Sequence, residues 1–408
     1  MEKISKQKRQ AAILYVASLS GIVLGVLSSI VNTRYVDPEV YGDVRYVQNI
    51  LNFISSILLL GFFQSGSRLL ALSDSIKYSR QIKGCMVVIL SVTVAIQMLF
   101  CYIGGLVHLE KTNLSQLFWI SIPVCGYPLL LNYMNTTAQG DNQIIRLSMS
   151  RLLPALLYVP IAYVVYKYFG ATAQKMILMQ WGIASIVLLS IIISTRPSFD
   201  NVKSVWSKLK KENRSYGSQL YIGSLVMVTT NYIAGITLGM FNQNNTEVGF
   251  YTLALTVTSP LATLPAIIGT TYFKEFSRQA QIPKKVMRAT LLLTLVSCVL
   301  FIILIKPVVG FLYPKQYSSV GLYAIILSVG YSMHGFGDMI NRYLGSHGEG
   351  RSIRNASIAN GIFKVFGFTV LVYFFNVYGA LITIVACDAI YMCTLIYYYR
   401  GIVKDKIL

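Results

Sequence analysis

Charged residues are scarce in this 408-residue chain, and acidic residues are the scarcer kind. Only 12% of the residues are charged, about half the share of a typical soluble domain. This composition, with 55% hydrophobic residues, excludes an ordinary soluble enzyme, a disordered chain and a fibrous protein. The net charge of +20 would suggest nucleic acid in a soluble protein. In a membrane protein it is expected to follow the topology of the loops, so we predict no nucleic-acid partner.

Motifs for catalysis and metal binding are also missing. The six cysteines lie in apolar runs without a Cys-x-x-Cys pair, so we interpret them as small buried hydrophobic side chains. The chain has no Gly-Lys dipeptide, which excludes the phosphate-binding loop of nucleotide-hydrolysing enzymes. A membrane-embedded glycosyltransferase or polymerase should show clustered acids or a sizeable basic outer loop, and neither is seen. We therefore predict a protein that is not an enzyme and that uses no cofactor and no metal.

Long apolar runs dominate what is present. A helix needs about 20 apolar residues to cross a bilayer. Runs of this kind lie near residues 11–33, 44–63, 84–107, 115–137, 150–169, 175–194, 218–241, 248–270, 287–306, 320–341, 355–375 and 379–399. The first run follows a basic segment, as in a signal peptide, but it is too long for one and we keep it as a helix. The sequence predicts an all-α polytopic membrane protein with about twelve transmembrane helices.

Basic residues and a weak internal repeat predict how these helices are organised. With the N-terminus inside, most of the 35 Lys and Arg residues fall in cytoplasmic loops, so both termini are expected in the cytoplasm. At an offset of 208 residues, loop positions of one half match those of the other. The matches are Glu39 with Glu247, Arg80 with Arg288, Gly140 with Gly348, and Arg146 with Arg354. We predict six-helix lobes at residues 1–200 and 218–408, a basic cytoplasmic linker at 201–217, and a central cavity. The alternative is a chance alignment.

Polar side chains inside the expected spans follow single helix faces. The predicted lining residues are Arg45, Gln48, Asn49, Asn52 and Ser55 on the second span, Thr252, Thr256 and Ser259 on the eighth, Asn32 on the first and Asn231 on the seventh. Polar groups are costly in a membrane, so we expect this set to line an aqueous lumen. The alternative is that these side chains join neighbouring helices.

A second polar set lies in the last three spans. His334 and Asp338 are one helical turn apart, while Lys364 and Asp388 carry opposite charges at similar expected depths. We expect Lys364 and Asp388 to be paired. The set is a structural ion pair, an ion-coupling site in which His334 and Asp338 titrate, or a site with a single exposed pore charge.

Four segments resemble motifs of one transporter family. They are residues 34–42 (RYVDPEVYG), 139–141 (QGD), 248–254 (VGFYTLA) and 311–317 (FLYPKQY). Their order resembles the Wzx-type O-antigen and capsule repeat-unit flippases of the multidrug/oligosaccharidyl-lipid/polysaccharide exporter superfamily. Asp37 departs from the usual glycine, and residues 273–277 lack a proline that the family often has.

The resemblance implies a flippase of the bacterial inner membrane. It would move an undecaprenyl-diphosphate-linked oligosaccharide from the cytoplasmic to the outer leaflet by alternating access. Arg45, with Arg34 and Arg68 as further candidates, would contact the diphosphate. The expected partners are this substrate, membrane lipids, and polysaccharide polymerase and chain-length proteins. The alternatives are a drug or small-solute/cation antiporter of the same superfamily, a lipid II flippase, which usually has more spans, and a non-transporting scaffold.

Overall fold

A computed structural model describes the backbone of residues 2–407 and the side chains of residues 16, 20–222, 225, 230–273 and 275–404. Over these residues the chain forms helices and no strand, which confirms the all-α prediction. It divides into two compact units. Unit 1 comprises Met1–Val36 and Tyr46–Tyr232, and unit 2 comprises Asp37–Arg45 and Ile233–Leu408. Each unit is described separately below.

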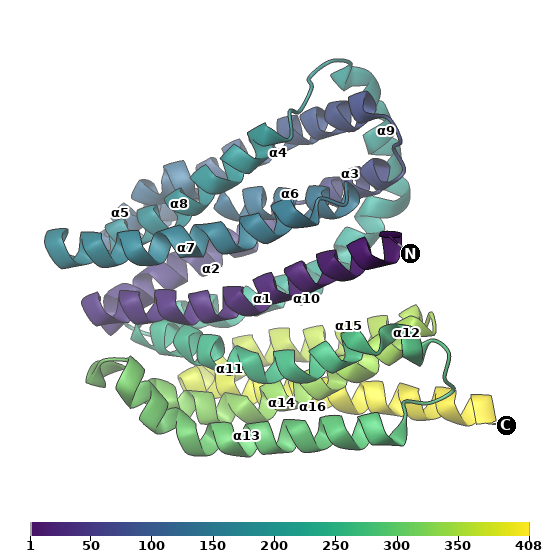
Figure 1. The fold of residues 1–408 in the computed structure, drawn as a ribbon. Helices are drawn as coiled ribbons and strands as arrows, with labels where there is room; N and C mark the ends of the chain where they lie inside the picture. The colour runs from purple at the N-terminus through teal and green to yellow at the C-terminus, as the bar shows by residue number, and fades with distance from the viewer. Residues whose placement is uncertain (1, 408) are drawn as a thin grey trace. The chain divides into compact units, whose positions relative to one another are not determined.

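Over the residues that the structure describes, unit 1 is built from ten α-helices, two of which, α2 and α10, lie partly in unit 2. Its helices are α1 (Glu2–Tyr35), α2 (Pro38–Leu58), α3 (Phe62–Ala71), α4 (Ile76–Val107), α5 (Thr112–Ser121), α6 (Tyr127–Gly140), α7 (Ile144–Phe169), α8 (Ala173–Ser194), α9 (Val202–Glu212) and the first part of α10 (Ser218–Phe241). Helix α7 packs against both α1 and α8, and α3 packs against α6 (Figure 1). Apolar side chains from several of these helices, including Phe63, Met86 and Tyr133, form one buried core.

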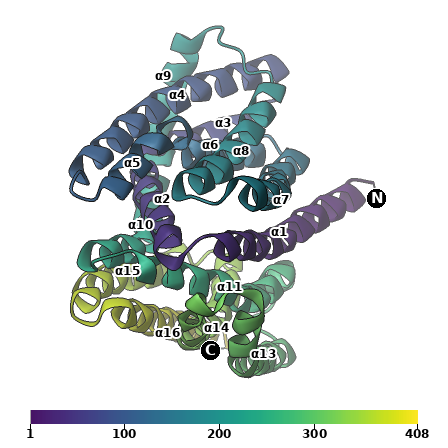
Figure 2. The ribbon, with the colours of Figure 1, turned by 90° about the vertical axis from the view of Figure 1, so that its left-hand side faces the viewer.

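Unit 2 is built around α14. Its helices are α11 (Thr246–Thr271), α12 (Phe273–Phe276), α13 (Lys284–Leu312), α14 (Ser319–Ser346), α15 (Gly350–Phe366) and α16 (Val372–Ile407). Helix α14 contacts α11, α13 and α16, and Figure 2 shows these helices gathered around it. In α13, only 17% of the most apolar stretch of 18 residues is buried, and Leu292, Val299 and Ile303 are exposed. An apolar helix with so little burial is suited to face lipid.

A sharp break separates α2 from α3, whose axes differ by 59°. Leu60 and Gly61 both adopt left-handed backbone conformations there, with φ of 48° and 78°. Asn213 stabilises the break, because its Nδ2 donates to the Leu60 carbonyl at 3.1 Å and thereby satisfies a helix-end acceptor. The Ser65 hydroxyl donates to Asn213 Oδ1 at 3.0 Å. The second expected span is therefore bent near its end.

Eight helical segments among the described residues are long and apolar enough to cross a membrane, or nine with the bent α2–α3 pair. The sequence predicted about twelve. The expected spans at 11–33 and 218–241 fall on α1 and α10, which include side chains outside the described set. The spans at 355–375 and 379–399 both fall in the single segment Gly350–Lys404, which is kinked at Asn376 (φ 51°). These differences account for the lower number, and the polytopic membrane fold is confirmed.

The boundaries of the two compact units differ from those of the predicted six-helix lobes in two places, and the lobes stay a prediction. Residues Asp37–Arg45, at the start of α2, belong to unit 2, where Asn245 Nδ2 donates to Asp43 Oδ1 at 2.8 Å. The expected linker and the first turns of α10 belong to unit 1, where the Tyr221 hydroxyl donates to the Ile57 carbonyl at 2.7 Å.

Candidate functional site

A polar cavity of about 280 Å³ lies within unit 1 among α2, α3, α6 and the start of α10. We call it the amide cavity. Its lining is rich in side-chain amides, hydroxyls and tyrosines, and consists of Asn52, Ser55, Ser56, Leu59, Gln64, Tyr127, Pro128, Leu131, Asn132, Asn135, Tyr221, Leu225 and Tyr232. A cavity lined in this way between transmembrane helices is unusual, because polar groups there are costly unless they serve a purpose.

The amide cavity is rich in hydrogen-bond acceptors. Gln64 Oε1, Asn132 Oδ1 and Asn135 Oδ1 are buried and have no hydrogen-bond partner in the part of the chain that the structure describes. The Ser55 and Ser56 hydroxyls donate to carbonyls of their own helix at 2.7 and 2.8 Å, so their oxygens are left to accept. Each unpaired buried acceptor costs roughly 1–3 kcal/mol. A ligand that carries several hydroxyl donors would recover this cost.

A second cavity, of about 250 Å³, adjoins the first and shares Tyr127 and Leu131 with it. We call it the arginine cavity, because Arg151 of α7 is the one charged residue in its lining. The remaining lining residues are Ser28, Ser150, Pro154, Ala155, Tyr158, Gln180, Trp181 and Ala184. The rings of Tyr127 and Trp181 lie with centroids 5.6 Å apart, so two aromatic side chains stand where the cavities meet. Such rings supply a broad apolar face together with a polar group.

The structure places the predicted lining residues of unit 1 in three environments. Asn52 and Ser55 line the amide cavity. Asn32 and Gln48 are buried behind the arginine cavity, where Asn32 accepts from the Tyr158 hydroxyl and Gln48 donates to Gln180 at 3.2 Å. Asn49 is half-buried on α2, and Asn231 is exposed on α10. Contact of any of them with a substrate stays a prediction.

The predicted lining residues of unit 2 lie along half-buried positions of α11. The hydroxyls of Thr252, Thr256 and Ser259 donate to carbonyls of their own helix at 2.8, 2.8 and 2.9 Å. Their hydroxyl hydrogens are thereby occupied, and their oxygens remain acceptors. They form a weaker polar surface than the amides of unit 1.

The three arginines expected at the diphosphate are not among the lining residues of the amide cavity or the arginine cavity. Arg45 belongs to unit 2 and lies over the Tyr41 ring, 4.8 Å from its centroid. Arg34 is exposed at the end of α1. Arg68 pairs with Glu212 at 2.7 Å and lies 4.6 Å from the ring centroid of Tyr216.

Sequence reasoning missed several cavity residues, although signals for them existed. The expected fifth span begins at residue 150, which puts Arg151 at its end. In the structure Arg151, Pro154 and Tyr158 share one face of α7 that lines the arginine cavity. Asn132 and Asn135 are likewise one turn apart inside the fourth expected span. The same search that found the polar face of α2 would have found the polar face of α6.

The second polar set forms a connected cluster in unit 2. His334 Nδ1 lies 3.0 Å from Asp388 Oδ1, and Lys364 Nζ lies 3.8 Å from the same oxygen. Asp338 Oδ2 lies 3.9 Å from His334 Nε2, and its other oxygen accepts from the Tyr391 hydroxyl at 3.0 Å. The expected pairing of Lys364 with Asp388 is present. No group of three or more His, Cys, Asp and Glu residues among those described has the geometry of a metal site.

Comparisons with solved structures show the fold. The chain superposes on the lipid II flippase MurJ in an inward closed conformation, with a TM-score of 0.76, 13% identity, and coverage of 95% of this chain and 87% of that one. The TM-score to an inward-facing multidrug resistance MATE family transporter of the MOP superfamily is 0.70, at 15% identity. That match covers 94% of this chain and 95% of the transporter. The TM-score to a MOP superfamily transporter from Pyrococcus furiosus is 0.56, at 12% identity. That match covers 97% of this chain and 95% of the transporter. At these identities the likeness establishes the two-lobed MOP fold alone.

Sequence comparison supplies the family. No curated protein matches the sequence significantly. The family model described as polysaccharide biosynthesis protein matches residues 8–279, which is well over half of the chain. With the all-α membrane fold of the MOP superfamily, this match shows that the chain belongs to the polysaccharide biosynthesis protein family.

Proposed function

We propose that this protein moves an oligosaccharide linked to undecaprenyl diphosphate from the cytoplasmic to the outer leaflet of the bacterial inner membrane. Its product would supply O-antigen or capsule synthesis. The observation that carries the proposal is the amide cavity, with three buried acceptors that have no partner among the described residues. Sugar hydroxyls are donors that would satisfy them, and the family membership is consistent with this substrate.

The chemistry of such a substrate requires two kinds of contact. Sugars and a diphosphate are too polar to cross hydrocarbon without replacement hydrogen bonds. The amide cavity supplies acceptors and amide donors for the sugar. The neighbouring arginine cavity supplies the Arg151 guanidinium, which is suited to bidentate contact with a phosphate. The lipid tail would remain in the bilayer throughout, and transport would proceed by alternating access without any catalytic step.

A second candidate function is a cation-coupled antiporter of the same superfamily. The observation that favours it is the cluster of His334, Asp338, Lys364 and Asp388. Carboxylates beside a histidine inside a membrane are able to exchange protons or ions. The two functions make different demands on unit 1, because a cationic drug would be held by acidic groups. The linings of the amide cavity and the arginine cavity include no acidic residue.

The test is deletion of the gene in its source strain. Lipid-linked repeat units are then measured on each face of sealed inner-membrane vesicles, together with surface polysaccharide. We expect surface polymer to be lost and complete single units to accumulate on the cytoplasmic face. Single units on the outer face would indicate a later polymerisation defect and contradict the proposal. Unchanged polysaccharide with altered drug sensitivity would favour the antiporter.

A further inference from the structure

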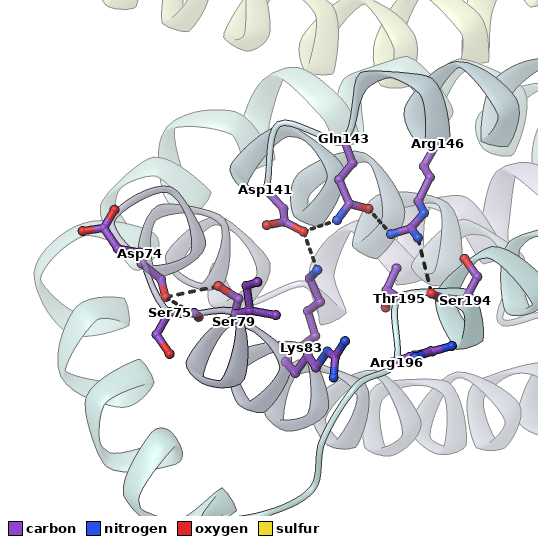
Figure 3. Close-up of a pocket in the computed structure, with 13 residues that line it drawn as sticks. Asp74, Ser75, Ser79, Lys83, Asp141, Gln143, Arg146, Ser194, Thr195 and Arg196 are labelled. Carbon is purple, nitrogen blue, oxygen red and sulfur yellow. Dashed lines mark hydrogen bonds and ion pairs between the residues drawn. The ribbon is translucent and has the colours of Figure 1, made fainter.

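A third cavity, of about 500 Å³, lies at the end of unit 1 where α4 and α7 begin and α8 ends (Figure 3). It is separate in its lining from the amide and arginine cavities, with which it shares no residue. Its charged residues are Arg80, Lys83, Arg146 and Arg196, with Asp74 and Asp141. Its remaining lining is mainly Ser, Thr and Gln, so nearly every group that faces it is polar.

A chain of hydrogen bonds across this cavity occupies the Asp141 carboxylate and positions Arg146. Lys83 and Gln143 both donate to Asp141, and the Gln143 oxygen accepts from Arg146 (Figure 3). Arg146 also donates from Nη2 to the Ser194 carbonyl of α8 at 3.3 Å. These bonds hold one edge of the guanidinium and leave its other N–H groups available. Asp141 is therefore committed to Lys83 and contributes little against an incoming anion.

Arg80 and Arg196 add two further guanidinium groups to the cavity, which is also lined by Asp74. Neither arginine makes an ion pair within the described part of the chain. Arg196 follows the end of α8 with a φ of 50°, a left-handed conformation that glycine or asparagine normally provides. An arginine held in this conformation costs about 1 kcal/mol or more, which points to a role for its side chain.

The backbone adds to the positive potential of the cavity. Ser75 caps α4 by accepting from the Tyr78 amide, and Gln143 immediately precedes α7. Both residues line the cavity, so two long helices begin at it. Helix N-termini carry partial positive charge and unsatisfied N–H groups, which complement the arginines in binding an anion. The positive-inside rule alone would explain why these loops are basic. It would not explain why the arginines line a cavity or why Arg196 has a strained backbone.

We propose that this cavity, which we call the phosphate pocket, binds a phosphate or diphosphate group carried by a lipid. The source is either the diphosphate of the lipid-linked substrate or the headgroup of an anionic phospholipid, since both present the same oxygens to Arg146, Arg80 and Arg196. The first source would make the pocket a docking site before entry, and this reading rests on the proposed function. The proposal that the pocket binds a lipid phosphate does not depend on the proposed function.

The test is lipid binding to the full-length purified protein, measured by native mass spectrometry. The probes are undecaprenyl diphosphate, dioleoyl phosphatidylglycerol and zwitterionic dioleoyl phosphatidylcholine. The variants are Arg196→Gly, which also relieves the left-handed strain, and Arg146→Gln, with Arg146→Lys retaining the charge. The matched control is Arg354→Gln, which removes an exposed arginine from the repeat-related position on α15 of unit 2.

We expect Arg196→Gly and Arg146→Gln to bind an anionic probe about tenfold more weakly than the wild type, with Arg146→Lys intermediate and Arg354→Gln unchanged. Arg196→Gly should unfold at the same temperature as the wild type or higher. Preference for undecaprenyl diphosphate identifies the substrate as the source, and preference for phosphatidylglycerol identifies the phospholipid. Equal binding by the wild type and both charge-removing variants overturns the pocket. Because no transport is measured, this result is distinct from a failure of the proposed function.

Discussion

Gln48 Nε2 donates a 3.2 Å hydrogen bond to Gln180 Oε1, and this bond joins the polar face of α2 to the lining of the arginine cavity on α8. The residues of this polar face therefore have two different roles. Gln48 fixes a cavity wall from behind, whereas Asn52 and Ser55, one and two turns further along, line the amide cavity directly. Unit 1 presents amides, hydroxyls, aromatic rings and one arginine to two adjoining cavities.

Replacement of Arg151 tests the phosphate contact of the arginine cavity. Arg151→Gln removes a charge-assisted hydrogen bond of about 1.5–3 kcal/mol, so transport of lipid-linked units should fall about tenfold or more at normal protein level. Arg151→Lys should restore part of the activity, because it keeps the charge and loses the bidentate geometry. Accumulation of units on the outer vesicle face is the measurement. Full transport by Arg151→Gln would remove Arg151 from the site.

Replacement of Asn132 should affect stability and transport in opposite directions. Asn132→Leu removes a buried acceptor that has no partner among the described residues, so thermal stability should stay the same or rise by about 1 kcal/mol. Transport should fall severalfold, because the sugar loses a hydrogen bond. The control is Asn360→Leu in unit 2, whose Oδ1 is also buried without a partner in the described region. That change should stabilise the protein and leave transport intact. Equal transport by both variants would contradict a sugar-binding role for the amide cavity.

Gly61→Ala tests the break between α2 and α3. A Cβ at residue 61 would lie 2.5 Å from the Gly217 carbonyl oxygen and would also be strained at φ +78°. Gly170 has nearly the same φ, +73°, but has no atom within 4 Å of its Cβ position. Gly170→Ala should cost about 1 kcal/mol from strain alone, and Gly61→Ala at least about 2 kcal/mol more. Thermal unfolding measures both. Equal losses would show that the contact of residue 61 with Gly217 is not tight in the membrane.

A double-mutant cycle separates the two readings of the unit 2 cluster. Lys364→Met removes one of the two groups that pair with Asp388, and Asp388→Asn leaves the half-buried Lys364 without its carboxylate. Each change should destabilise the protein by about 1–3 kcal/mol. For a structural pair, the double variant should recover at least about 1 kcal/mol of this loss and retain transport. A double variant that folds normally and no longer transports would instead support the ion-coupling alternative, in which His334 and Asp338 titrate.

The sequence predicted the membrane fold well because spans depend on the length of apolar runs, which is a local property. Helical periodicity is local too, and it put Asn52 and Ser55 on one face of the second span. Both line the amide cavity, and their contact with a substrate stays a prediction. Arg151 was missed because the fifth span was expected to begin at residue 150. Helix α7 begins at Ile144, so Arg151 lies ~10 Å inside it. Helix ends are the feature that a sequence pattern predicts least well. Here a shift of about two helical turns moves Arg151 from the expected helix end to a position inside the helix, where it lines a cavity.

The most direct test of the central claim is photocrosslinking from the amide cavity. A photoreactive residue is placed at Ser56, which lines the cavity, and as a control at Ser190, which is exposed on α8 of the same unit. Each variant is irradiated in membranes that contain radiolabelled lipid-linked repeat units. The account predicts labelling from position 56 and none from position 190. An active transporter that is labelled equally from both positions, or only from position 190, would contradict it.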